Sequence, residues 1–273
     1  ETKHPLKEFD MIGFSLGHEM TYTNVLEMLA LSQIPVLAAE RNDSHPLVIA
    51  GGTCVLNPEP IADFFDFFVI GDGEEVTLEL LQVIRAWKEQ KTTKEQLLRQ
   101  VAKLDGIYVP SLYEVEYYPD GRLKSFSPTV PEAKPIIQRR IVNKLPAPVI
   151  KPIVSYIETI HDRGAIEIQR GCTRGCRFCQ AGIIYRPMRL RPQDEIEKAA
   201  DEILQNCGYD EVSLVSLSSG DYPGIDQLVR KLSSRFENLS LSLPSLHINS
   251  FSLELMEALS PRKKIGLTFA PEA

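Results

Sequence analysis

The sequence lacks a long apolar run and an opening signal peptide. Its stretch FFDFFVI is short and is interrupted by Asp66, whereas a membrane-spanning helix needs roughly 18 apolar residues. The sequence also lacks an excess of basic residues, because its formal net charge is -7. This charge argues against a general binder of nucleic acids or membrane surfaces. We therefore expect a cytoplasmic protein with no membrane partner.

Cysteine is scarce, and the five cysteines do not form the even, widely spaced set of a disulfide framework. Three of them, Cys172, Cys176 and Cys179, lie within eight residues in the stretch RGCTRGCRFCQAG. In a chain without an export signal, this clustering favours metal binding or redox chemistry. The other two, Cys54 and Cys207, are interpreted as small buried hydrophobic residues.

The first part of the chain alternates between strand and helix patterns and indicates a parallel α/β domain over residues 1–104. The predicted strands are Phe9–Leu16, Pro46–Gly52 and Phe64–Glu75. The predicted helices are Thr21–Ile34, Glu75–Gln90 and a short one that ends near Lys103. Thr92 and Glu95 are expected to form a capping box at the start of the short helix.

Residues 105–160 differ from the parts on either side. Leu112–Pro128 has the pattern of a β-hairpin that turns at Pro119, Asp120 and Gly121. Prolines then recur as far as Pro152, which predicts an extended linker on the surface. We therefore expect a domain boundary in this region.

The third part, residues 161–273, returns to alternating strands and helices. The predicted strands are Ala165–Gln169, Glu211–Leu217, Leu239–Ile248 and Lys264–Ala270. The predicted helices are Asp194–Asn206, Ile225–Phe236 and Leu253–Leu259. Four strands with a helix between each pair predict part of a parallel (β/α) barrel. Because the fourth strand ends close to Ala273, we expect the C-terminal units of this barrel to be missing.

The cysteine cluster follows the first of these strands as one compact loop. Spacings of four and three residues let the loop reach three corners of an iron–sulfur cluster, while a complete four-iron cluster takes four thiolates. Gly171 and Gly175 allow the tight backbone turns that such a loop needs. The missing fourth cysteine therefore predicts an iron that is left open for a substrate or a cofactor.

These features resemble the radical S-adenosylmethionine (SAM) superfamily, which has a Cys-x-x-x-Cys-x-x-Cys loop after the first strand of a β/α series and an aromatic residue, here Phe178, before the last cysteine. The resemblance implies a [4Fe-4S] cluster on Cys172, Cys176 and Cys179, with SAM at the open iron. It implies reductive cleavage of SAM to methionine and a 5′-deoxyadenosyl radical, which abstracts hydrogen from a substrate that the sequence does not identify. It also implies a flavodoxin- or ferredoxin-type electron donor.

The same resemblance implies further residues that contact SAM. Phe178 is expected beside the adenine. The segment SSGD after the second strand takes the place of a glycine-rich segment that meets the SAM amino group in the family, although it has a single glycine. Glu272, at the end of the fourth strand, is expected to be another contact. The predicted SAM contacts are thus Phe178, Ser218, Ser219, Gly220, Asp221 and Glu272.

The first domain carries a second resemblance. This domain resembles the later half of a cobalamin-binding, Rossmann-like domain that is incomplete at its N-terminus. The resemblance lies in the residues at the ends of its strands, which are Leu16, the pair Gly51 and Gly52, and the stretch VIGDGEE. That family binds cobalt through an Asp-x-His-x-x-Gly motif, which this sequence lacks, so cobalamin binding is left open. The expected fold is α/β, with a partial Rossmann-like domain before a partial radical SAM barrel.

Two alternatives stay open on the sequence alone. The loop could hold zinc, completed by His161, or a structural cluster in a non-catalytic binding module. The chain could also be a tRNA-modifying, methylthiotransferase-like enzyme with an RNA substrate, because seven arginines against one acid, Glu167, surround the loop. The arginines could equally pair with acids elsewhere, and base-stacking aromatics are sparse here. The seven are Arg163, Arg170, Arg174, Arg177, Arg186, Arg189 and Arg191.

Overall fold

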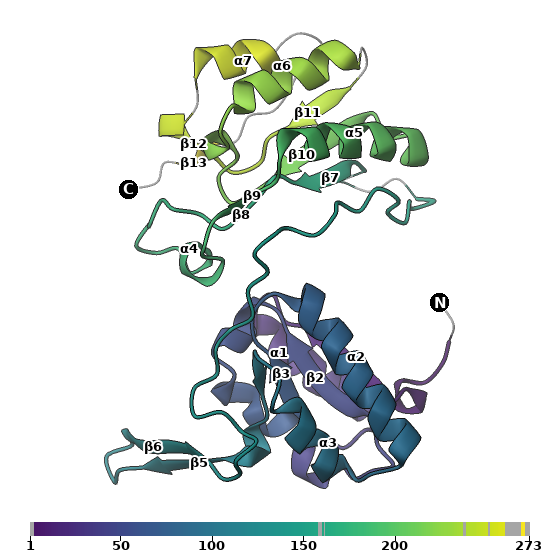
Figure 1. Cartoon of the computed structure of the whole chain (residues 1–273), viewed down its shortest axis with the longest axis vertical. Coiled ribbons are helices and arrows are strands. Elements are labelled where there is room, and N and C mark those ends of the chain that lie inside the picture. The colour runs from purple at the N-terminus through teal and green to yellow at the C-terminus, as the bar shows by residue number, and fades with distance from the viewer. Residues whose placement is uncertain are drawn as a thin grey trace. The chain divides into compact units, whose positions relative to one another are not determined.

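The chain forms two compact units, Glu1–Val142 and Asn143–Ala273 (Figure 1). The computed structural model describes residues 3–157, 160, 162–236, 239–250, 252–259 and 269–270. Both units combine helices with parallel strands, so the predicted α/β class is confirmed. None of the helices in the described part of the chain is long and apolar enough to cross a membrane.

A four-stranded sheet forms the centre of the first unit. Its strands, in their order across the sheet, are β1 (Met11–Ser15), β2 (Leu47–Gly51), β3 (Phe67–Val69) and β4 (Ile107–Tyr108). The first three are parallel, whereas β4 runs antiparallel to β3 at the edge. The three parallel strands lie within the three predicted apolar runs. The sequence pattern does not predict the antiparallel edge strand.

Helices cover both faces of this sheet, because successive side chains of a strand point to opposite faces. Val48 and Ala50 of β2 pack in a core that includes α1. Leu47 and Ile49 pack in a second core with α2 and α3. Both faces of β2 are therefore apolar, as expected for a parallel strand that is covered on two sides. The three helices are α1 (Tyr22–Leu31), α2 (Gly73–Gln90) and α3 (Lys94–Val101).

The cap of α3 lies one residue later than the sequence predicts. Thr93 Oγ1 accepts from the Gln96 N–H at 3.3 Å, and the Gln96 side chain accepts from the Thr93 N–H at 3.4 Å. The predicted box of Thr92 and Glu95 is therefore wrong. The stretch TTKEQ contains two overlapping pairs with the same spacing, so spacing alone does not distinguish them.

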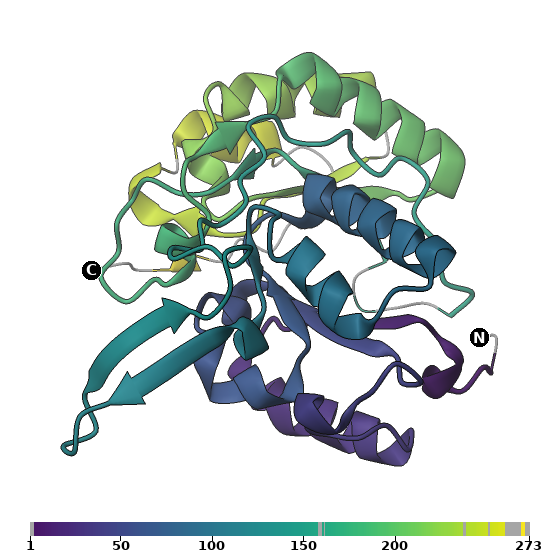
Figure 2. The ribbon, with the colours of Figure 1, turned by 60° about the horizontal axis from the view of Figure 1, so that its bottom comes forward.

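The predicted β-hairpin is confirmed, with strands β5 (Tyr113–Tyr117) and β6 (Leu123–Pro128). Figure 2 shows it extending away from the sheet of the first unit. At its base the rings of Tyr113 and Phe126 stack with their centroids 4.8 Å apart, and both approach Tyr108 of β4. The hairpin is therefore attached to the core of the first unit.

The first unit continues well beyond residue 104, where the sequence analysis ends its first domain. Arg140 forms a parallel bridge with Gly71, and its carbonyl accepts from the Asp72 N–H at 2.9 Å. These contacts fasten the first half of the predicted linker to the end of β3. The boundary between the two units falls between Val142 and Asn143. The Val142 N–H still donates to the side chain of Asp72, which follows β3, at 3.0 Å.

Three parallel strands form the main sheet of the second unit, in the order β11-β10-β7. The strands are β7 (Gly164–Glu167), β10 (Glu211–Val215) and β11 (Ser240–Ser242), and the helices are α5 (Gln193–Cys207), α6 (Ile225–Arg235) and α7 (Leu253–Leu259). Apolar side chains of the strands and of these helices form one core. Strands that neighbour each other in sequence pair in parallel, with a helix between them, as the predicted barrel segment requires. The shorter elements are β8 (Gln169–Arg170), α4 (Ala181–Ile184), β9 (Arg189–Leu190), η7 (Ser219–Asp221), β12 (Leu246–His247) and β13 (Phe269–Ala270).

The predicted strand Leu239–Ile248 is divided in two, which corrects the sequence analysis. Its first part is β11, and its second part, β12, pairs with β13 instead. Pro244 has no N–H for a strand ladder and Ser245 has a φ of 58°, so the extended run breaks at these two residues. Of the predicted strand Lys264–Ala270, only the two residues of β13 lie within the described part of the chain.

Candidate metal centre

The three clustered cysteines lie in one loop of the second unit, between β8 and β9. These two short strands pair antiparallel and so close the loop at its base. The short helix α4 lies within the loop (Figure 1). All three cysteines are free thiols, of which Cys172 is buried while Cys176 and Cys179 are partly exposed. The loop is therefore a closed structure that carries three available sulfurs.

Gly171 makes the tight start of this loop. Its φ is +86°, in the region that favours glycine, and a Cβ there would lie 2.5 Å from the Tyr185 carbonyl oxygen and 2.9 Å from that of Pro187. The returning end of the loop thus lies directly against Gly171. Gly175 has a φ of +69°, but a Cβ there would meet only the end of the Arg186 side chain, at 3.9 Å. Close packing therefore requires a glycine at 171 more strictly than at 175.

Backbone N–H groups point at two of the sulfurs. The Arg174 N–H donates to Cys172 Sγ at 3.4 Å, and the Gly182 N–H donates to Cys179 Sγ at 3.3 Å. A metal binds the thiolate form of cysteine, and N–H donors stabilise the negative charge of that form. The loop therefore presents its cysteines in a way that suits metal ligands.

The donor set of the loop is three thiols, one fewer than the four protein ligands of a closed zinc site. Among the residues that the structure describes, no three His, Cys, Asp or Glu side chains converge closely enough to hold one metal ion. A four-iron cluster binds its thiolates at separate irons, so the ligands lie further apart than those of one zinc ion. His161, the predicted fourth zinc ligand, lies outside the described residues. Cys172, Cys176 and Cys179 are thus the residues that would hold a cluster.

The predicted SAM-binding segment after β10 is packed tightly within the fold. Ser219 is fully buried, and its hydroxyl lies 2.7 Å from the Pro244 carbonyl and 3.1 Å from that of Leu214. A Cβ at Gly220 would lie 2.5 Å from Ser250 Oγ. These two residues fix the position of the segment, and their contact with SAM stays a prediction.

Asp221 ties this segment to the cysteine loop. Arg174 donates from Nε to Oδ2 of Asp221 at 2.7 Å and from Nη2 to Oδ1. The Ser218 hydroxyl donates to the same Oδ2 at 2.8 Å. The hydrogen bonds from Arg174 hold the pKa of Asp221 below its usual value, against the opposing effect of desolvation. Residues 47 positions apart in sequence are thereby brought together beside the three cysteines.

The two other predicted SAM contacts lie in different situations. Phe178 has 70% of its surface exposed, between Cys176 and Cys179 on the loop. Its ring is therefore accessible to a ligand. Glu272 lies outside the described residues, so its role stays a prediction.

Gln169 is a residue at the loop that the sequence analysis misses. Its side chain is buried, and its Nε2 donates to the Gly171 carbonyl at 3.2 Å. Its Oε1 has no hydrogen-bond partner among the described residues, which is unusual for a buried polar atom. The sequence feature that could have pointed to Gln169 is its position. It is a polar residue at the end of an apolar strand, and it directly precedes the cysteine loop.

At least five of the seven arginines around the loop have partners within the protein. Arg189 donates to the carbonyls of Tyr185 and Pro187. These contacts support the interpretation in which the arginines pair within the fold. The four ion pairs are Arg163 with Glu211, Arg170 with Glu167, Arg174 with Asp221, and Arg191 with Glu195.

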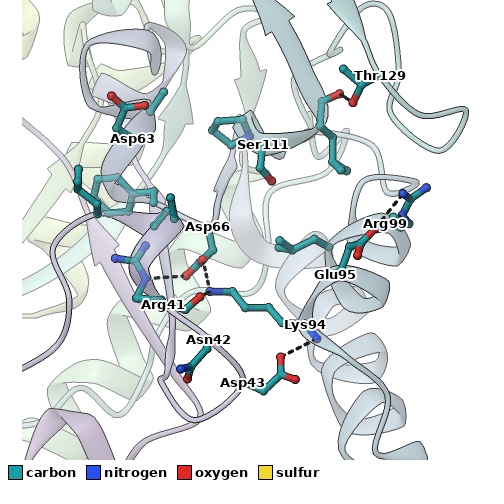
Figure 3. Close-up of a pocket in the computed structure, with 18 of the residues that line it drawn as sticks. Arg41, Asn42, Asp43, Asp63, Asp66, Lys94, Glu95, Arg99, Ser111 and Thr129 are labelled. Carbon is teal, nitrogen blue, oxygen red and sulfur yellow. Dashed lines mark hydrogen bonds and ion pairs between the residues drawn. The ribbon is translucent and has the colours of Figure 1, made fainter.

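A separate pocket of about 1090 Å³ lies in the first unit, where residues that precede β2 and β3 come together (Figure 3). It is lined by three charged side chains that are almost fully buried, Arg41, Asp66 and Lys94. Asp66 accepts from Arg41 Nε at 3.3 Å and from Lys94 Nζ at 2.6 Å. Burial lowers the pKa of Arg41, and the charge of Asp66 opposes this effect.

The network in this pocket is satisfied by the protein itself. Arg41 also donates to three backbone carbonyls, and Asp66 also accepts from the Val48 N–H at 2.7 Å. Lys94 Nζ lies 3.3 Å from the carbonyl of Arg41. The sequence analysis notes Asp66 only as a break in an apolar run and misses its two partners. We interpret this network as support for the fold rather than as a binding site.

The glycines that resemble a cobalamin domain are used inside the first unit. Gly52 has a φ of +100°, and a Cβ there would lie 2.6 Å from the Leu16 carbonyl oxygen. Gly71 has a φ of +108°, and its Cβ would overlap the backbone of Arg140. At both strand ends the chain's own backbone lies against the glycine. These positions therefore give no independent support for a cofactor.

Two family models match the chain. Residues 1–110 match the model of radical SAM proteins, N-terminal, and residues 166–271 match that of the radical SAM superfamily. The second match includes the complete cysteine loop and the segment after β10. The predicted resemblance to radical SAM proteins is therefore confirmed, whereas the likeness of the first unit to a cobalamin-binding domain stays a prediction.

Two curated relatives are similar in sequence. An uncharacterized protein of Methanocaldococcus jannaschii is 29% identical over 269 residues, which are 98% of this chain and 50% of that protein. The threonylcarbamoyladenosine tRNA methylthiotransferase MtaB of Bacillus subtilis is 26% identical over 138 residues, which are 48% of this chain and 28% of that protein. The chain thus spans half the length of the first relative and less of the second.

Two solved structures share the fold. Both are of the radical S-adenosylmethionine methyltransferase TsrM from Kitasatospora setae, one with cobalamin and a [4Fe-4S] cluster and the other with tryptophan substrate and a SAM analog. The TM-scores are 0.57 and 0.55 at 14% and 13% identity, and the matches cover 92% and 93% of this chain and 47% of each of those chains. At this identity the likeness establishes the fold alone.

Proposed function

The chain carries the N-terminal and core domains of radical SAM proteins, and from this premise we propose that it acts in a radical SAM enzyme with a [4Fe-4S] cluster and SAM as cofactors. The observation that carries the proposal is the closed loop with three free thiols, two of which accept backbone N–H groups. The proposal leaves the substrate unnamed.

The residues of the loop have different proposed roles in binding the cluster and SAM. Cys172, Cys176 and Cys179 would each bind one iron, which leaves the fourth for SAM. When bound, the cluster would supply an electron that cleaves SAM to methionine and a 5′-deoxyadenosyl radical, which abstracts hydrogen from the substrate. The N–H groups of Arg174 and Gly182 would stabilise the charge on two sulfurs. A flavodoxin- or ferredoxin-type donor fits this site, because the loop is partly exposed.

Two side chains beside the loop are proposed to contact SAM. The exposed ring of Phe178 would pack against the adenine, and the carboxylate of Asp221 would receive the SAM amino group. Ser218 orients Asp221 through its hydroxyl. Ser219 and Gly220 would act by holding this segment in place, since both are packed against the chain itself.

The methylthiotransferase alternative has one supporting observation, which is the similarity to the Bacillus subtilis tRNA enzyme over 48% of the chain. Its other ground, the arginines around the loop, is weaker, because at least five of them already have partners in the fold. No role is proposed for cobalamin, because the sequence lacks the cobalt-binding motif and the glycines at the strand ends face the protein's own backbone.

Anaerobic reconstitution with iron and sulfide tests the proposal. We expect about four irons per chain and the broad visible absorption of an iron–sulfur cluster. Incubation with SAM and dithionite is then expected to release 5′-deoxyadenosine. A variant with alanine at Cys172, Cys176 and Cys179 is expected to lose the iron, whereas the matched variant Cys207→Ala, outside the loop, is expected to keep it.

Two results would contradict this function. Iron content that is unchanged in the triple variant would show that the loop is not the binding site. Stoichiometric zinc in protein purified without oxygen, together with no binding of SAM, would favour the non-catalytic module instead.

A further inference from the structure

We propose that Arg174 is a positioning residue that tunes the reduction potential of the cluster, because Asp221 holds its guanidinium group in a fixed position at the cysteine loop. The inference rests on the proposed function, since it concerns the same metal centre. It goes beyond the binding of the cluster, because it assigns a role to a side chain that binds no iron.

The backbone of Arg174 is fixed against one of the sulfurs. Arg174 lies between Cys172 and Cys176 in the loop, and its N–H donates to Cys172 Sγ at 3.4 Å. This hydrogen bond fixes the position of the Arg174 backbone, so the side chain begins at a defined place within the loop. A substitution of the side chain leaves this N–H in place. Any effect of the substitution therefore reports on the guanidinium group.

The guanidinium group is fixed at its other end by Asp221. Two hydrogen bonds join it to both carboxylate oxygens, one of them 2.7 Å long, in the paired geometry that gives arginine–carboxylate pairs their orientation. Asp221 is itself held by the Ser218 hydroxyl. Only 31% of the Arg174 side chain and 20% of the Asp221 side chain are exposed, so the pair is shielded from solvent more than an ordinary surface ion pair.

The positive charge of Arg174 lies within the cysteine loop. The residue stands between Cys172 and Cys176 in the sequence, and its own N–H contacts Cys172 Sγ. The neighbouring arginines differ in position, because Arg170 lies in β8 and Arg191 follows β9, where they pair with Glu167 and Glu195. Arg174 is therefore an arginine whose ion pair fixes a charge inside the loop itself.

A fixed positive charge at this place has a defined effect on an iron–sulfur cluster. Reduction adds one electron and makes the cluster more negative, so a nearby positive charge stabilises the reduced form and raises the reduction potential. Lysine cannot reproduce the effect fully, because its ammonium group does not bind both carboxylate oxygens in one plane. Removal of the charge is therefore expected to lower the potential, and replacement by lysine to lower it less.

The test compares Arg174→Gln and Arg174→Lys with Arg177→Gln as the matched control. Arg177 lies in the same loop and carries the same charge, but it has no ion pair among the described residues that would hold its guanidinium group in place. Each reconstituted protein is titrated against redox mediators, and the reduced cluster is followed by electron paramagnetic resonance. We expect wild-type iron content throughout, a more negative midpoint potential in Arg174→Gln, a smaller shift in Arg174→Lys and the smallest shift in Arg177→Gln.

The outcomes separate the inference from the proposed function. A full cluster with an unchanged potential in Arg174→Gln, or an equal shift in Arg177→Gln, would overturn the inference and leave the function standing. Loss of iron in both Arg174 variants would also overturn it, because the residue would then serve assembly rather than tuning. If only Arg174→Gln loses iron, the midpoint potential of Arg174→Lys tests the inference. A more negative potential than in the wild type supports it, and an unchanged potential overturns it. A wild-type protein that binds no iron would overturn both proposals.

Discussion

The two units use charged side chains in opposite ways. In the first unit, Arg41, Asp66 and Lys94 are buried together, and their polar groups are satisfied by one another and by the backbone. In the second unit, Arg174 and Asp221 form a partly exposed pair beside the cysteine loop. Removal of one partner from a buried network leaves an uncompensated charge, whereas exposed pairs contribute little to stability. The first group therefore supports the fold, and the second belongs to the site.

The comparison also shows that a pocket with charged walls is not by itself a binding site. The pocket of the first unit is large, but each of its three buried charges already has partners within the fold. At the cysteine loop the reverse holds, because three free thiols and the buried Oε1 of Gln169 remain available.

The largest effect is expected from Asp66→Asn in the first unit. This change leaves Arg41 and Lys94 buried without their carboxylate, and breaking a buried ion pair in this way costs about 3–5 kcal/mol of the free energy of unfolding. Chemical denaturation followed by circular dichroism measures the loss. The iron content of the folded protein after reconstitution is expected to stay at the wild-type level, because Asp66 belongs to the other unit.

Asp63→Asn is the matched control for this prediction. Asp63 lines the same pocket but is exposed, so its substitution is expected to change the free energy of unfolding by no more than about 0.5 kcal/mol. The assignment of the buried network to stability would be refuted if Asp66→Asn unfolded like the wild type. It would also be refuted if Asp63→Asn were equally destabilising.

Gly171→Ala is expected to have the converse effect, on the metal centre alone. Its Cβ would lie 2.5 Å from the Tyr185 carbonyl oxygen, and its φ of +86° is unfavourable for alanine, so the two ends of the loop are pushed apart. We expect the variant to lose most of the reconstituted iron. The unfolding of the first unit, measured as for Asp66→Asn, is expected to be unchanged.

Gly175→Ala controls for backbone strain without the close contact. Its φ is also positive, but no backbone atom outside the adjacent residues lies within 4 Å of the added Cβ. The strain of about 1 kcal/mol is expected to leave most of the iron bound. Equal loss of iron in both variants would show that backbone strain at a positive φ, and not the close contact with the Tyr185 carbonyl, causes the loss of iron.

Local patterns in the sequence predict much of the architecture. The apolar runs around β2 and β3 predict buried parallel strands, because both faces of these strands are covered. The spacing of Cys172, Cys176 and Cys179 predicts the metal loop, since all three ligands lie in one short segment. For the strands hydropathy alone is sufficient for the prediction, and for the loop the predicted ligands are close in sequence.

Pairings between distant residues are what the sequence does not reveal. Asp66 lies 25 residues from Arg41, and Arg174 lies 47 residues from Asp221, so no spacing rule connects either pair. The break of the predicted strand at Pro244 shows a related limit, because apolar residues continue on both sides of this proline while the strand itself does not. The sequence predicts Asp221 as a site residue, but the arginine that holds it emerges only from the fold.

The smallest effect is expected at the cap of α3, which places Lys94 next to the buried Asp66. Thr93→Ala removes the acceptor for the Gln96 N–H and is expected to reduce the free energy of unfolding by about 1 kcal/mol, whereas Thr92→Ala is expected to have almost no effect. Denaturation of both variants measures this difference. Because Lys94 begins the capped helix, Thr93→Ala and Asp66→Asn are expected to be non-additive when combined. A larger loss of the free energy of unfolding in Thr92→Ala than in Thr93→Ala would show that Thr92 is the capping residue, as the sequence predicts.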